Sequence, residues 1–83
     1  MGDVARDPRQ IGNLIRRARK KNALSQKQLG EKVALRQETI SLIETGNPAT
    51  RTKNLLAVLA ALDLEFQITP RSREWSKHIE SYL

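Results

Sequence analysis

LSQKQLGEKVALRQETISLIETG, residues 24–46, decides how this chain folds, because it predicts two short helices joined by a tight turn. Ser25 is followed three residues later by Gln28, a pattern typical of a capping box at a helix start. The first helix repeats apolar residues at a spacing of four, and residues 33–36 then interrupt the period. An ordinary helical hairpin of a small bundle would show the same features.

The second helix of this pair carries polar side chains on the face opposite its apolar anchors. Ile40 and Ile43 are expected to point inward. The opposite face then holds three polar residues: Gln37, Glu38 and Ser41. Amides, hydroxyls and a charge on one helix face suit hydrogen bonding to base edges in a DNA major groove. This face therefore favours DNA recognition over a plain hairpin.

The stretch resembles the Cro/CI-type (XRE) helix-turn-helix family, whose pattern is roughly Leu-[Ser/Thr]-Gln-x-x-Leu-Ala followed by Thr-Ile-Ser-x-Ile-Glu-x-Gly. This chain has LSQKQLG at residues 24–30 and TISLIETG at residues 39–46. Gly30 stands where the family usually has alanine. Ala34 replaces the usual turn glycine, whose positive φ alanine adopts only at a cost. The resemblance covers about residues 8–64 and implies an all-α, lambda-repressor-like bundle of four to five helices that binds double-stranded DNA.

The composition of the chain favours a polyanionic binding partner. The 83 residues make one domain, and without cysteine they form neither a disulfide framework nor a thiolate metal site. Of the net charge of +6, residues 1–46 carry most, with ten basic and five acidic residues, against five and four in residues 47–83. A positive field on the half with the helix pair favours DNA, although a basic run is often only a solvated helix face.

The sequence contains no constellation typical of an enzyme and no targeting segment. There is one histidine, no glycine-rich phosphate loop and no cluster of metal ligands, so we expect no catalysis, cofactor or metal. No apolar run approaches the ~18 residues of a membrane span, and no signal-peptide pattern opens the chain. We expect a cytoplasmic protein that is nucleoid-associated when bound to its operator.

Periodicity divides the chain into four segments. Residues 1–7 are short and polar, and we expect a flexible N-terminus. Residues 8–64 hold the helix-turn-helix domain, which closes with a largely apolar helix capped by Thr50. Residues 65–69 predict a strand, and residues 70–83 form a tail that can hold a short helix.

The predicted strand also predicts a homodimer interface. Leu64-Glu65-Phe66-Gln67-Ile68 alternates apolar and polar residues until Pro70 stops it. A lone strand leaves an open edge, and pairing with the same strand of a second copy is the economical solution. The apolar residues of this strand would then lie in a homodimer interface: Leu64, Phe66 and Ile68. The alternative is an extended tail packed on its own core.

A domain of this type whose last helix leads directly into a short strand is also similar to the HipB-like antitoxins. In this chain the helix and the strand are expected within LLAVLAALDLEFQITP, residues 55–70. No sequence motif specific to these antitoxins accompanies the likeness. It implies a repressor of its own operon that dimerises partly through the strand and binds a toxin, a HipA-like kinase. The alternatives are a stand-alone regulator without a toxin, or an interaction adaptor that keeps the helix-turn-helix as scaffold.

On a palindromic operator, the start and outer face of the second helix would contact bases, through Arg36, Gln37, Glu38 and Ser41. Arg36 could be bidentate to guanine and Gln37 to adenine, whereas Glu38 could accept from a cytosine amino group or pair with Arg36. Leu42 remains open between a thymine methyl contact and packing along the helix edge. The resemblance and the position of helix starts and loops give the phosphate-binding candidates: Gln26, Lys27, Thr39, Thr45, Asn47, Arg51 and Lys53.

Two other groups have different expected roles. In the family, the leucine that opens the pattern, here Leu24, is preceded by an arginine five residues earlier. That arginine binds the glutamate that ends the second helix of the pair. This implies a structural ion pair between Arg19 and Glu44. In the tail, Trp75, Ile79 and Tyr82 fall on one stripe of a short amphipathic helix. That stripe either binds a partner, or folds back on its own domain or frays.

Overall fold

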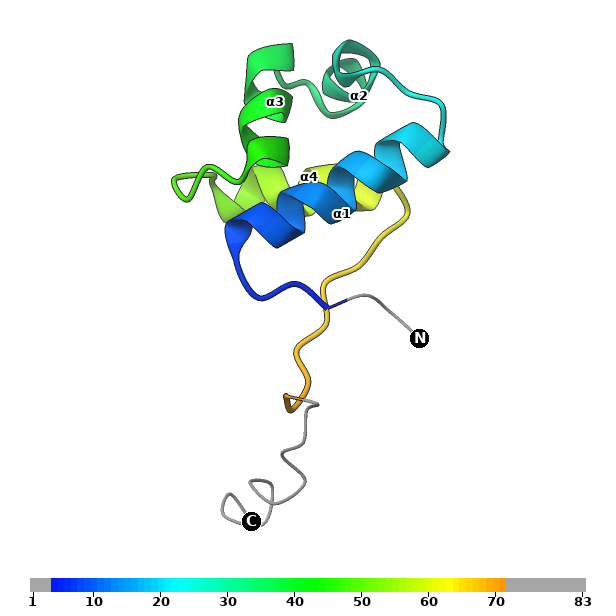
Figure 1. Cartoon of the computed structure of the whole chain (residues 1–83). Coiled ribbons are helices and arrows are strands. Elements are labelled where there is room, and N and C mark those ends of the chain that lie inside the picture. Colours follow the sequence, from blue (N-terminus) through cyan, green and yellow to red (C-terminus); the bar gives the residue numbers. More distant parts are fainter. Residues whose placement is uncertain (1–3, 72–83) are drawn as a thin grey trace.

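Four helices make up the computed structural model, which describes residues 4–71. They are α1 (Pro8–Lys21), α2 (Gln26–Val33), α3 (Gln37–Thr45) and α4 (Thr52–Ala61). Helix α3 contacts α1 and α2, and α2 also contacts α4. Helix α1 crosses in front of α4, with α2 and α3 above the pair (Figure 1). The all-α helix-turn-helix fold is therefore confirmed; the fifth helix considered for the tail falls outside the described residues.

The core lies where the apolar stripes of the helices meet. Its six buried apolar side chains are Ile15, Leu29, Ile40, Ile43, Val58 and Leu62. Leu29 anchors α2, while Ile40 and Ile43 anchor α3 as the sequence predicts. Full burial of each such side chain contributes about 1.5–3 kcal/mol. These anchors fix α3 against the bundle by one face and leave its other face outside.

Local hydrogen bonds decide where α2 and α4 begin. The Ser25 hydroxyl oxygen accepts from the Gln28 N–H at 3.0 Å, and the Gln28 side-chain oxygen accepts from the Ser25 N–H at 2.8 Å. The predicted capping box is thus confirmed. Thr50 as the cap of α4 is wrong: Arg51 holds that position, without a side-chain cap. The Thr50 N–H donates to the Asn47 carbonyl at 3.1 Å, which keeps Thr50 in the preceding loop.

The turn between α2 and α3 depends on both departures from the family pattern. Ala34 ends α2 in the left-handed conformation, with φ 59° and ψ 41°. The Leu35 N–H then donates to the Gly30 carbonyl at 2.8 Å. A Cβ on Gly30 would lie only 2.5 Å from the Leu35 carbonyl oxygen. Glycine at position 30 therefore makes room for the turn that alanine at position 34 has to form.

We expect Ala34→Gly to raise the free energy of unfolding by up to about 1 kcal/mol. The left-handed conformation costs an L-residue roughly 1–2 kcal/mol, and the gain is partly offset by the greater freedom of glycine in the unfolded chain. Urea denaturation measures the change, with Ala34→Val as the matched variant that should lose stability. A less stable Ala34→Gly protein would contradict the strain assigned to this turn.

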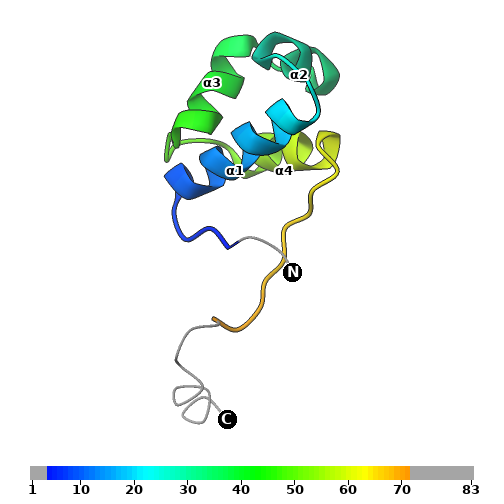
Figure 2. The ribbon, with the colours of Figure 1, turned by 45° about the vertical axis from the view of Figure 1, so that its right-hand side comes forward.

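After α4 the chain leaves the bundle in an extended course. Residues 64–71 run away from the helices (Figure 1, Figure 2), and no strand forms within residues 4–71. Phe66 and Ile68 are 57% and 98% exposed, so neither packs closely on its own core. Strand pairing requires a second copy of the chain, so the predicted dimer contact through Leu64, Phe66 and Ile68 stays a prediction.

Candidate nucleic-acid interface

Helix α3 turns outward the face that the sequence assigns to base contacts. Ile40, Ile43 and Glu44 are buried against the bundle, which directs the remaining positions of the helix outward. The base-contact candidates lie at its start and along its outer side: Arg36, Gln37, Glu38 and Ser41. The first three are exposed and the last is half-buried. Within residues 4–71 their side chains form no hydrogen bond or ion pair, so Glu38 is not paired with Arg36.

A buried ion pair ties α3 to α1. The Arg19 Nε donates to Glu44 Oε2 at 2.6 Å and its Nη2 to Glu44 Oε1 at 3.1 Å. The Arg19 Nη1 also donates to the Leu24 carbonyl at 2.8 Å, and the Gln26 Nε2 donates to Glu44 Oε1 at 3.1 Å. The two charged side chains are only 10% and 2% exposed. This network holds α1, the start of α2 and the end of α3 in one arrangement.

The same network keeps Arg19 charged. The hydrogen bond to Glu44 raises the pKa of the guanidinium above its ordinary value, against the lowering effect of burial. A cation with a raised pKa contributes stability that is fully present below its unfolded pKa and is lost only as the pH rises through the folded value. For Arg19 that window lies above the ordinary pKa of arginine and far above neutral pH, so deprotonation of this arginine does not weaken the network near neutral pH.

Gln26 has a structural contact in addition to its expected contact with phosphate. Its side chain is half-buried and one of its amide N–H groups is directed to Glu44. An amide has two such donors, so one remains for a ligand. Lys27, the next residue, is exposed at the start of α2. Both phosphate contacts remain predictions.

Three of the expected phosphate-binding residues line one shallow hollow between α3 and the start of α4: Thr39, Asn47 and Arg51. The hollow has a volume of about 160 Å³. No side chain caps the first N–H groups of α4 beside it, and such groups carry partial positive charge. Together with the Arg51 guanidinium they make this side of α3 suitable for a phosphate.

The other two candidates near this loop lie outside the hollow. The Thr45 hydroxyl donates to the Ser41 carbonyl at 3.0 Å, so its oxygen is left as an acceptor while its proton is engaged. Lys53 is exposed in the first turn of α4. Asn54, absent from the predicted set, is half-buried and lines the hollow. Its spacing of three residues from Arg51 is the sequence signal that could have placed it there.

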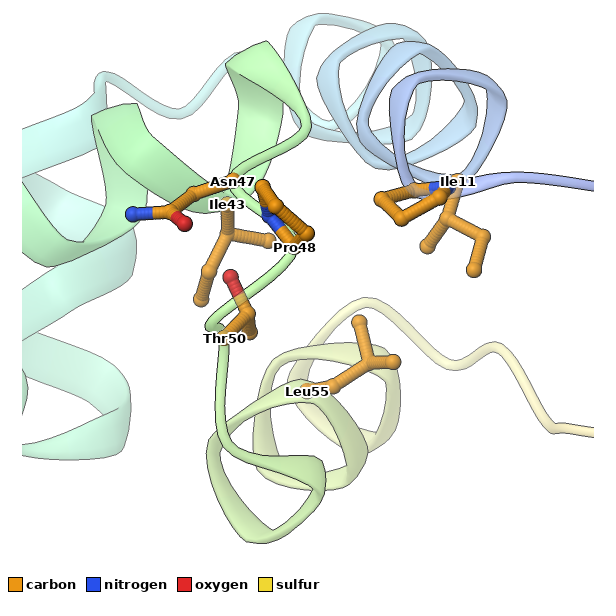
Figure 3. Close-up of a pocket in the computed structure, with 7 residues that line it drawn as sticks. Ile11, Ile43, Asn47, Pro48, Thr50 and Leu55 are labelled. Carbon is orange, nitrogen blue, oxygen red and sulfur yellow. The ribbon is translucent and has the colours of Figure 1, made fainter.

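A second hollow lies under the loop that joins α3 to α4, and it is apolar (Figure 3). Ile11 of α1, Ile43 of α3 and Leu55 of α4 line it, with Pro48 at its edge. The Asn47 side chain points away from Ile11 and Leu55 (Figure 3). The volume of this apolar hollow, about 90 Å³, is far below the roughly 300–1,000 Å³ typical of small-molecule sites. It is a small gap between α1, α3 and α4.

None of the helices within residues 4–71 is long and apolar enough to cross a membrane. In the same range, no three or more His, Cys, Asp or Glu side chains come together as a metal site. The expected partner-binding stripe of Trp75, Ile79 and Tyr82 lies outside the described residues.

Comparison with known proteins agrees with the geometry. The model of a helix-turn-helix family matches residues 15–68. A solved complex of a HipB variant with an O2 20mer has a TM-score of 0.78 and 26% sequence identity, over 87% of this chain and 100% of that chain. A HipA–HipB–O2–O3 complex has a TM-score of 0.79 and 24% identity, over 86% and 100%. No curated protein matches the sequence.

Proposed function

Because this chain belongs to the helix-turn-helix family of DNA-binding transcriptional regulators, we propose that it is a homodimeric, sequence-specific repressor of its own operon. The observation that carries the proposal is the polar outer face of α3, whose side chains at Arg36, Gln37 and Glu38 are exposed. The opposite face of the helix is fixed by Ile40, Ile43 and Glu44. Such a helix can enter a major groove without rearranging the bundle.

Each polar side chain on this face suits a different base edge. The Arg36 guanidinium matches the two acceptors of guanine, and the Gln37 amide matches the acceptor and donor of adenine. Glu38 has no basic partner within residues 4–71, so its carboxylate is free to accept from a cytosine amino group. Gln26 and Lys27 of the phosphate candidates lie at the start of α2, and Thr39, Asn47 and Arg51 line the hollow beside α4. Contacts to both strands would set the register of the helix in the groove.

Gln37→Ala tests this assignment. We expect it to weaken binding to the duplex immediately upstream of the protein's own reading frame by about 5- to 150-fold per half-site, the value of one bidentate base contact of roughly 1–3 kcal/mol. The melting temperature should stay unchanged, because the side chain is exposed and forms no hydrogen bond or ion pair within the described chain. Fluorescence anisotropy gives the dissociation constant and calorimetry the melting temperature. An unchanged dissociation constant would count against base contact by this residue.

The homodimer part of the proposal rests on the segment after α4. Phe66 and Ile68 are exposed on an extended stretch that has an open backbone edge, and such an edge is a template for pairing. Pairing of residues 65–69 across a two-fold axis would cover these side chains. It would also set two α3 helices against a palindromic operator, with half-site centres about one helical turn, ~10 bp, apart.

The partner part of the proposal is an antitoxin role, in which the chain also binds a HipA-like kinase toxin. It is supported by the fold likeness to HipB, which occurs in a solved complex with HipA. A toxin reading frame next to this one, whose product co-purifies with the full chain, would support this role. Its absence would favour the stand-alone regulator, and weak DNA binding with little salt dependence would favour the interaction adaptor.

A further inference from the structure

Leu42 is an exposed leucine in the middle of the outward face of α3. Its side chain is 51% exposed, and one turn earlier on the same side lies Glu38. Ile40, Ile43 and Glu44 are buried, and at 100° per residue Leu42 lies within about 30° of the direction opposite their mean. A single exposed leucine is ordinary on a protein surface. What needs an explanation is its position directly after Ser41 and one turn after Glu38, two of the proposed base-contact residues.

Packing along the helix edge does not account for Leu42. Its buried part lines the hollow beside Thr39 and Asn47, but the residue belongs neither to the buried core nor to the apolar side chains packed against it. About half of its surface therefore faces the same solvent as Glu38. The structure thus favours the first of the two roles that the sequence leaves open.

We propose that Leu42 is a specificity-determining residue that contacts a thymine methyl group in each operator half-site. The inference rests on the proposed DNA-binding function and extends it to a residue outside the polar set. The thymine methyl is the apolar group that base edges present in the major groove. The four residues from Glu38 to Leu42 advance about 6 Å along the helix, or about two base pairs at 3.4 Å each. The thymine should therefore lie about two base pairs from the base that Glu38 contacts.

The test removes the methyl group from the DNA and the leucine from the protein. Random 20-bp duplexes are first selected on the full chain, and each thymine of the enriched half-site is then replaced in turn by deoxyuridine. For the wild type, one such replacement should weaken binding about fourfold per half-site, the value of one buried methyl group. Leu42→Ala should bind the thymine and deoxyuridine duplexes equally. Gln37→Ala is the matched control, since it should bind more weakly but keep the fourfold penalty.

The outcomes separate this inference from the function on which it rests. If selection enriches a half-site but the wild type shows no penalty at any thymine, or Leu42→Ala keeps the penalty, the role of Leu42 is overturned and DNA recognition stands. If no sequence is enriched, the proposed function fails and the inference with it. Melting temperatures check folding, and Leu42→Gln provides a second exposed, helix-compatible variant that should also lose the methyl penalty.

Discussion

Glu44→Ala is expected to lower the free energy of unfolding by about 3–5 kcal/mol. The substitution leaves the Arg19 guanidinium, which is only 10% exposed, without its carboxylate, and an uncompensated buried charge has this cost. It also removes the acceptor of the Gln26 amide. For a domain of this size, in which 1 kcal/mol corresponds to about 4–8 °C, the melting temperature should fall by about 12–40 °C. Thermal unfolding followed by circular dichroism measures the change.

Glu38→Ala is the matched control for this prediction. It removes the same side chain from the same helix, but Glu38 is exposed and has no ion pair within the described residues, so stability should change by at most about 0.5 kcal/mol. The double variant Arg19→Met/Glu44→Leu should be more stable than Glu44→Ala, because no charge remains buried. Equal losses in Glu38→Ala and Glu44→Ala would show that the Arg19–Glu44 pair does not brace α3.

The affinity for operator DNA is expected to fall by about 10³–10⁵ between 50 and 200 mM salt. This follows if the dimer neutralises ~6–10 phosphates and releases their counterions. The phosphate candidates at the start of α2 and around the hollow beside α4 can supply that number when two copies bind. Anisotropy titrations across a salt series give the slope directly. Arg51→Ala should make it shallower by about one unit per copy, whereas Gln37→Ala should leave it unchanged.

A flat salt profile would contradict this prediction. It would mean that few phosphates are contacted, and the basic residues of the N-terminal half would then be only a solvated surface. The interaction adaptor would become the better account of the fold. The comparison between Arg51→Ala and Gln37→Ala adds a second criterion, because only a phosphate contact changes the slope.

The types and spacing of neighbouring residues were sufficient to predict the helix pair α2 and α3. The Ser25–Gln28 capping box and the inward isoleucines of α3 follow from residue type and spacing alone. The Arg19–Glu44 contact was implied by the family resemblance, since 25 residues separate the partners and no periodicity links them. The left-handed Ala34 followed from the departure at the turn position, and the structure adds why Gly30 accompanies it.

Features that depend on packing between helices could not be predicted. Thr50 has the residue type of a helix cap, yet the hydrogen bond to Asn47 keeps it in the loop and moves the start of α4 to Thr52. The hollow that brings Thr39 and Arg51 together depends on how α3 meets α4, which spacing along the chain does not specify. For the same reason Asn54 was missed.

The most direct test of the central claim is the binding of the wild-type protein to the duplex just upstream of its own reading frame. Fluorescence anisotropy at physiological salt, with excess scrambled duplex as competitor, gives both affinity and stoichiometry. We predict tight binding that resists the competitor and saturates at two copies per palindrome. Binding no tighter than to the scrambled duplex would contradict the proposal that this protein represses its own operon.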